Sequence, residues 1–398
     1  MKNKIIVFIV TFALMILATP FVFGKLMNSK FDEMIKDLQK KGYVIEQIED
    51  KSTYLTTVRV FRVIIPGEKI DKSRSIKEAV LEVESKFKNL PVTDVRFFGK
   101  VLKIKYYDIE LEKEINKLIK DKIKFLVITP NFKTYKYKVF DIKIQKGIEE
   151  IKLTGLEGVY HHPKKNFLKA RSLLYKNSQK VSIEIKEFKD SYEKKENRIN
   201  QNIGFNFYVT LDNNKITLLN VKIDSILYGG KKIKNVLNVN FDSFNLLNNI
   251  FVKNFDLKFV ADNIDSQTLK KIQQTKDRYE REELLKELIS KGMDISLDLK
   301  IKDIEAMKQK LGFLNLDAKI KFLPDPLILE KLKNNDLSSV EAALRLQTTP
   351  EIATLIMNLF PKSAFMFAFA KKENGTVSLV LKVKNGEIYI NGEKITSD

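Results

Sequence analysis

The stretch FNFYVTLDNNKITLLNVKI at residues 205–223 indicates the fold most clearly. Apolar side chains alternate with other residues along its first half and, after a polar turn at 212–215, along its second half. The apolar positions are Phe205, Phe207, Val209, Leu211, Ile216, Leu218, Val221 and Ile223. A period of two puts such side chains on one face of a strand, and a short polar turn joins antiparallel neighbours. The stretch therefore predicts a β-hairpin with one apolar and one polar face.

The same alternation recurs through the second part of the chain. Further runs lie at residues 181–185, 237–241, 255–259, 295–301 and 314–322. Near the C-terminus, three Asn-Gly pairs occur at 374–375, 385–386 and 391–392. Asn and Gly tolerate the positive φ angles of tight hairpin turns. Consecutive strands with short connections predict an antiparallel meander.

The first part of the chain reads as mixed α and β. Helices are predicted at 26–41, 74–88 and 110–121, and strands at 54–65, 92–106, 123–129 and 133–145. The helix at 74–88 rests on the apolar spacing of Ile76, Val80, Val83 and Phe87. In the second part, helices are predicted near 268–291 and 350–360.

These segments together predict an α+β, β-rich fold. We expect a long antiparallel meander or curved sheets with a few packed helices, preceded by one transmembrane helix. The expected divisions are an N-terminal anchor at 1–24, a mixed α/β membrane-proximal domain at 25–150, and an antiparallel β-rich domain at 151–398.

The N-terminus predicts where the chain resides. Lys2 and Lys4 precede the uncharged run IIVFIVTFALMILATPFVFG at Ile5–Gly24. Twenty helical residues span about 30 Å, the hydrocarbon thickness of a bilayer. We expect an uncleaved, single-pass signal anchor in a bacterial inner membrane, with most of the chain on the periplasmic side. The alternative is a cleaved signal peptide, with Val22 and Gly24 before the cut.

Composition removes several kinds of chemistry. The chain has no cysteine, which excludes disulfides, thiolate catalysis and Cys-based metal sites. Its only histidines, His161 and His162, are adjacent in a loop-like segment without nearby ligand spacing. Asp294, Asp298 and Asp303 suggest a divalent-ion site, but Asp294, Ser296 and Asp298 alternate with Ile and Leu, which explains them as the polar face of a strand. We predict no enzyme, no cofactor and no metal.

The charge of +20 at pH 7 raises the question of a polyanionic partner. Most of the 71 basic residues are lysines spread along the whole chain, whereas nucleic-acid proteins rely on arginine for bidentate contacts. We therefore predict a solvated lysine surface and no nucleic-acid partner, with a weak attraction to anionic lipid headgroups.

Three stretches carry a resemblance to a known family. They are the terminal hairpin SLVLKVKNGEIYINGEKI (378–395), the strand VEAALRLQ (340–347) followed by the helix EIATLIMNLF (351–360), and ISKGMDISLDLKI (289–301). The chain resembles, over about residues 250–398, the YdgA-like family of bacterial envelope proteins, a domain of unknown function. The resemblance implies a hydrophobic N-terminal segment and a long β-rich body, and it supplies no catalytic residues.

The apolar faces provide the candidate site. Most of their residues are expected to close a core, and part of one face is expected to stay open as a hydrophobic groove. The candidate lining is Phe365, Phe367, Phe369, Leu355 and Leu359. The leading hypothesis is a non-enzymatic, membrane-anchored envelope protein that binds a lipid or another hydrophobic partner and supports envelope maintenance. The alternative is an interaction scaffold in a larger envelope-spanning complex, and the oligomeric state is left open.

Overall fold

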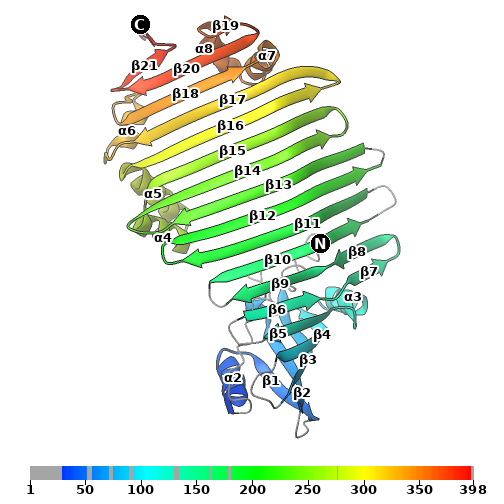
Figure 1. Cartoon of the computed structure of the whole chain (residues 1–398). Helices are drawn as coiled ribbons and strands as arrows, with labels where there is room; N and C mark the ends of the chain where they lie inside the picture. The colour runs from blue at the N-terminus through cyan, green and yellow to red at the C-terminus, as the bar shows by residue number, and fades with distance from the viewer. Residues whose placement is uncertain are drawn as a thin grey trace. The chain divides into compact units, whose positions relative to one another are not determined.

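The computed structural model describes residues 29–51, 56–70, 75–88, 94–129, 134–161, 164–177, 181–212, 214–275 and 277–395 (Figure 1). It confirms a β-rich fold in which antiparallel strands are accompanied by a few helices. The predicted membrane segment Ile5–Gly24 lies outside the described residues. Within those residues, no helix combines the length and the apolar character needed to cross a bilayer.

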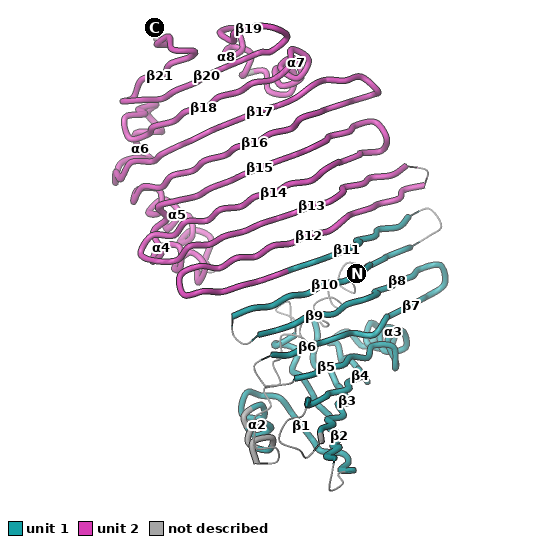
Figure 2. The backbone as a smooth tube through the Cα atoms, in the orientation of Figure 1, with its two compact units in different colours: residues 1–190 teal, residues 191–398 magenta. Residues whose placement is uncertain are grey.

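The chain divides into two compact units, residues 1–190 and 191–398 (Figure 2). Strand β11 (Val181–Lys195) runs through this division. The domain boundary expected at 150/151 falls inside β8 (Glu149–Thr154).

Unit 1 is a mixed α/β unit whose strands pair antiparallel. Its elements are α2 (Ser29–Lys40), β1 (Val44–Asp50), β2 (Thr56–Pro66), η1 (Gly67–Lys69), β3 (Ile76–Lys88), β4 (Val95–Tyr106), α3 (Ile109–Ile119), β5 (Lys124–Thr129), β6 (Thr134–Val139), β7 (Ile142–Lys146), β8, β9 (Leu156–His161) and β10 (Lys165–Lys176). The pairing order runs β1-β2-β3-β4-β5-β6-β9-β10, and β8 joins β10 to β7. One continuous hydrophobic core fills this unit.

The predicted helix at 74–88 is wrong, because this segment forms strand β3 between β2 and β4. From Ala79 to Phe87 every second residue is buried, including Leu81 and Val83. Ile76 and Val80 are four residues apart, and so are Val83 and Phe87. This spacing fits one face of a helix and also one face of a strand. Pairing with β2 and β4 on both sides favours the strand, although Glu, Lys, Ala and Leu in this segment are good helix formers.

Unit 2 is a meander of long strands with helices at its ends. After β11 its elements are β12 (Arg198–Leu211), β13 (Asn214–Tyr228), β14 (Lys232–Leu246), β15 (Ile250–Asp265), α4 (Ser266–Gln274), α5 (Arg278–Ser290), β16 (Met293–Ala306), β17 (Gln309–Phe322), α6 (Ile328–Lys333), β18 (Val340–Thr348), α7 (Pro350–Leu359), η2 (Pro361–Ser363), α8 (Ala364–Ala368), β19 (Lys371–Glu373), β20 (Thr376–Lys384), β21 (Glu387–Ile390) and β22 (Glu393–Ile395). Each strand from β12 to β18 pairs antiparallel with the next, and β18 pairs with β20.

Two local features of unit 2 depend on turn and capping residues. All three Asn-Gly pairs have positive φ at both residues, for example 53° at Asn385 and 80° at Gly386, as predicted for tight hairpin turns. The segment 268–291 forms the two helices α4 and α5 instead of one. Asp277 caps the second helix by accepting a hydrogen bond from the Glu280 N–H, and such a cap starts a new helix.

Candidate functional site: an apolar face of unit 2

The strands of unit 2 present two chemically different faces. One row across the sheet joins directly paired residues from β12 to β20: Ile203, Ile223, Val239, Leu257, Leu299, Leu316, Leu346 and Leu379. The adjacent row on the other face, from β12 to β18, is Asn202, Asp224, Asn238, Lys258, Asp298, Asp317 and Arg345. Because paired residues share a face, the alternation predicted for single strands becomes one apolar and one polar face of the whole meander.

Extra residues in the middle of β13–β16 keep the apolar face continuous. Between Phe205 and Phe207 of β12, the partner positions on β13 jump from Val221 to Leu218, so two residues of β13 face one of β12. In the middle of β13 to β16 the pairing then continues without a shift, and β14 and β15 have a separate shift near one end, between Ile233 and Asn235. The compensating shift appears between β16 and β17, after Ile301. These strands therefore share a row of β-bulges.

Asn side chains accommodate this row of bulges. Asn220 in β13 and Asn254 in β15 have φ of 53° and 51°, a left-handed conformation that Asn tolerates well. The Asn220 N–H donates to Asn206 Oδ1 at 2.6 Å, and its side-chain amide donates to Asp242 at 2.6 Å. The bulge adds one residue to the alternation of β13. Leu218 and Val221 are three residues apart, and both therefore lie on the apolar face.

Helices cover this apolar face at its two ends. At one end, α4 and α5 bury Ala261, Ile264 and Leu288 against Phe259 and Ile233. At the other end, α7 and α8 form a second cluster with the strands β17, β18 and β20. Its buried residues are Leu346, Ala353, Phe367, Val377, Leu379 and Ile390. The two clusters are separate, so the middle of the face lies between them.

A polar network holds α4 and α5 together. Thr268 is fully buried, and its hydroxyl donates to Asp265 Oδ1 and lies 3.0 Å from Glu287 Oε1. The Lys291 ammonium lies 3.1 Å from Asp265 and 2.7 Å from Glu287. Hydrogen bonds from the Thr268 N–H and hydroxyl, and then from Lys291, lower the pKa of Asp265 from 3.8 to about 2. The network fixes the helical cover over this end of the face.

Between the covered ends nine apolar side chains stay half-buried, whereas Val221, which pairs with Phe205, is buried. We call this set the open apolar strip: Ile203, Phe205, Ile223, Val239, Phe241, Phe255, Leu257, Leu299 and Ile301. The rings of Phe241 and Phe255 stack with centroids 4.5 Å apart and planes 5° from parallel. Neighbouring side chains of the strip thus shield one another within the sheet, while their outer surfaces stay accessible. A contiguous accessible apolar surface of this kind is a candidate interaction site.

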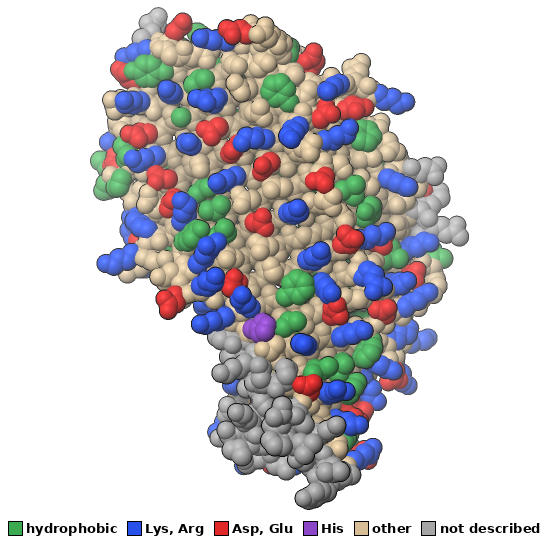
Figure 3. All heavy atoms as spheres, in the orientation of Figure 1, with side chains coloured by type: hydrophobic (Ala, Val, Ile, Leu, Met, Phe, Trp, Pro, Cys, Tyr) green, Lys and Arg blue, Asp and Glu red, His purple; other side chains and the backbone are tan. Residues whose placement is uncertain are grey.

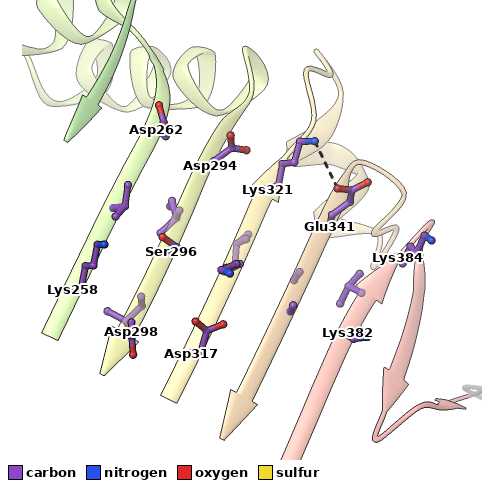
Figure 4. A pocket seen from close by; sticks show the side chains of 18 of the residues that line it. Lys258, Asp262, Asp294, Ser296, Asp298, Asp317, Lys321, Glu341, Lys382 and Lys384 are labelled. Atoms are coloured by element: carbon purple, nitrogen blue, oxygen red, sulfur yellow. Dashed lines mark ion pairs between the residues drawn. The ribbon is translucent and has the colours of Figure 1, made fainter. Parts of the chain in front are cut away.

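The opposite face is charged. Lys and Arg side chains alternate there with Asp and Glu over the strands of unit 2 (Figure 3). A shallow hollow of about 780 Å³ lies on this face over β14–β18 and β20, and charged side chains from neighbouring strands surround it (Figure 4). Lys234 lies 2.9 Å from Asp262, and Lys321 lies 3.8 Å from Glu341. Mixed signs of charge make this a well-hydrated surface.

The predicted groove residues are divided between core and surface. Phe365, Phe367 and Phe369 alternate as in a strand, but α8 forms here. In this helix Phe365 and Phe369 lie on one side, with ring centroids 5.3 Å apart, and Phe367 is buried in the α7/α8 cluster. Leu355 and Leu359 are 42% and 65% exposed on α7. The open apolar strip was not predicted, although the sequence shows that the two-residue alternation is interrupted between Leu218 and Val221.

The polar candidates take ordinary structural positions. His161 ends β9, with Nδ1 2.9 Å from the Thr134 hydroxyl, and His162 lies outside the described residues. Asp294 accepts a hydrogen bond from Asn263, and Asp298 pairs with Lys300 at 3.0 Å. In the part of the chain that the structure describes, no three His, Asp or Glu side chains gather in a way that could hold a metal ion.

Comparisons with known proteins add no assignment. The chain matches no protein-family model, no curated protein and no solved structure.

Proposed function

We propose that this chain is a non-enzymatic bacterial envelope protein that binds a hydrophobic ligand along the open apolar strip. In this proposal Ile5–Gly24 anchors the chain in the inner membrane, and the β-rich part lies on the extracytoplasmic side. The YdgA-like resemblance over about residues 250–398 belongs to the same proposal. The observation that carries it is the strip itself, half-buried between two covered ends.

Physical chemistry supports a ligand over the strip. Apolar surface that leaves water contributes about 25 cal/mol per Å². An antiparallel sheet with one polar face is stable in water when its other face is covered. The strip has long rows of Leu, Ile, Val and Phe without charged side chains, as in the row from Ile203 to Leu299. Such a surface suits an extended hydrocarbon chain better than a compact polar molecule.

Mass spectrometry of an organic extract tests the proposal. The full chain is purified from membranes beside a strip variant, Val239→Asp with Leu257→Asp. The matched control is Asn238→Asp with Lys258→Asp, which changes the adjacent positions on the polar face. Lipids around the membrane segment are common to all samples. We expect one lipid to be enriched in the wild-type and control extracts and lost from the strip variant, because a bound lipid would have to desolvate the two introduced carboxylates.

Equal extracts from all samples would refute a stable lipid ligand. The scaffold alternative would then be the better proposal, and its partner would be sought by crosslinking.

A further inference from the structure

We propose that Asn374 and Asn385 are sites of spontaneous deamidation, whereas Asn391 is protected from the same reaction by the fold. Each of the three is followed by glycine and stands in a hairpin turn at the C-terminal end of unit 2, around β19, β20 and β21 (Figure 1). Their φ angles of 49°, 53° and 51° are nearly the same, so the backbone of the turns does not distinguish them. The proposal goes beyond ligand binding on the open apolar strip and does not depend on it.

The reaction needs only the asparagine, the next backbone nitrogen and water. The glycine nitrogen attacks the asparagine Cγ, so that an N–Cγ bond forms, the Cγ–Nδ2 bond breaks and ammonia leaves with the proton of the glycine N–H. Water then opens the cyclic imide at either of its carbonyls, which leaves an aspartate or an isoaspartate. A glycine in the second position favours the attack, because it has no Cβ and its backbone turns freely. The local structure around each pair therefore decides which asparagine reacts.

The side chains of Asn374 and Asn385 are accessible. Both are exposed, and among the residues that the structure describes neither of them makes a side-chain hydrogen bond. A Cβ at Gly375 would have no atom within 4 Å, so the turn at Asn374 has room to rearrange. The glycine nitrogen reaches Cγ only when the turn opens, and β19 pairs with β20 through three residues. A short hairpin end at the surface opens at a low cost in free energy.

The side-chain amide of Asn391 is held at both of its polar atoms. Nδ2 donates to the Phe369 carbonyl at 2.5 Å, and Oδ1 accepts from the Val380 N–H at 2.8 Å. The Asn391 N–H also donates to the Val380 carbonyl at 2.7 Å. Nδ2 is the atom that has to leave, and rotation of the amide toward the next nitrogen breaks both side-chain hydrogen bonds. Deamidation at this position therefore requires local opening of the hairpin.

The protected asparagine connects three parts of the C-terminal end. Phe369 caps the end of α8, Val380 lies in β20, and Asn391 follows β21. An aspartate at position 391 could not donate to the Phe369 carbonyl, so α8 would lose a contact that fixes it over the apolar face. At position 374 or 385 the product is a new negative charge on an exposed turn, and an isoaspartate also lengthens the backbone of that turn.

Peptide mapping of the full chain compares the three positions in one sample. The folded protein, purified in a mild detergent, is incubated at mildly alkaline pH and then digested with pepsin in acid, where deamidation is slow. Mass spectrometry measures the deamidated fraction at each position over time, and electron-transfer fragmentation distinguishes aspartate from isoaspartate. The matched control is the same protein incubated in guanidinium, where all three Asn-Gly pairs are exposed alike.

In the folded chain we expect Asn374 and Asn385 to react roughly tenfold faster than Asn391 or more, because two side-chain hydrogen bonds of Asn391 have to break first. In guanidinium the three rates should become similar. Ile390→Ala removes a buried side chain next to Asn391 and should raise the rate at position 391 but not at 374, because the terminal hairpin opens more often. Circular dichroism checks that this variant stays folded.

Equal rates at the three positions of the folded chain would overturn the proposal. It would also be overturned if Asn374 and Asn385 stayed intact in the folded chain while the guanidinium sample reacted. A rate at position 391 that Ile390→Ala leaves unchanged would refute protection by the closed hairpin. None of these outcomes depends on a bound lipid, so this proposal and the ligand proposal can fail separately.

Discussion

A Leu→Ala pair distinguishes the covered end of the apolar face from the open strip. Leu379 and Leu257 belong to the same row across the sheet, but Leu379 is 2% exposed beneath α7 and α8, whereas Leu257 is half-buried. Leu379→Ala removes fully buried methyl groups and leaves a cavity, which costs about 2–5 kcal/mol. Leu257→Ala leaves no enclosed cavity, because its outer surface is already accessible. We expect a cost of about 1 kcal/mol from the lost transfer free energy alone.

Urea titration of the full chain, followed by circular dichroism, measures both costs from the shift of the unfolding midpoint. Wild-type protein and both variants are compared after delipidation, so that a ligand on the strip does not contribute. A free energy of unfolding lowered equally by the two substitutions would refute the reasoning. It would mean that Leu257 is packed as tightly as Leu379 and that the strip is ordinary core.

Three further predictions concern the backbone and the helical cover. Gly312→Ala should lower the free energy of unfolding by more than 1 kcal/mol in a thermal melt, because Gly312 has φ of 110° and a Cβ there would lie 2.2 Å from Thr349 Cγ2. The control Gly375→Ala should cost less, because Gly375 has φ of 71° but open space around the new Cβ. The pKa of Asp265 falls from 3.8 when unfolded to about 2 when folded, so its contribution is complete above pH 4 and disappears as the pH falls towards 2. Asp265→Asn should flatten the pH dependence of urea unfolding in that window, and an unchanged slope would contradict this assignment. Thr268→Val should cost about 1 kcal/mol in the same titration, because it removes the hydrogen bonds from the buried Thr268 hydroxyl to Asp265 and Glu287; a neutral result would show that Lys291 and water satisfy both carboxylates without it.

Local turn chemistry and strand alternation made much of unit 2 predictable. The Asn-Gly pairs adopt the positive φ angles that two-residue hairpins require, and the runs around Phe205 and Ile223 form paired strands. These features depend on neighbouring residues, so a single sequence contains them. The helices at 29–40, 109–119 and 350–359 were predictable for the same reason.

Features that depend on partners were not predictable in the same way. The segment of β3 has apolar residues at helical spacing, and only pairing with β2 and β4 decides for the strand. Phe367 and its neighbours at 365 and 369 alternate as in a strand, yet packing against the sheet places them in a helix. Tertiary context thus overrides local pattern at both places.

The open apolar strip was not predicted, because the exposure of an apolar sheet face depends on several strands and on the helices that cover them. Alternation in β14 or β15 predicts an apolar face, but whether a helix covers it depends on the whole arrangement. Leu257 and Leu379 are leucines in the same row across the sheet, but only Leu379 is covered by α7 and α8 and so belongs to the core. Leu355 and Leu359, which were predicted to line a groove, are exposed on the surface of α7.

Site-specific photocrosslinking in intact cells tests the central claim most directly. A benzophenone amino acid replaces Leu257 on the strip or, as the matched control, Lys258 on the opposite face of the same strand. After irradiation the full chain is purified and its mass is measured. We predict a defined lipid adduct at position 257 and none at position 258. No adduct at either position, or equal adducts at both, would contradict the claim that the open apolar strip holds a hydrophobic ligand.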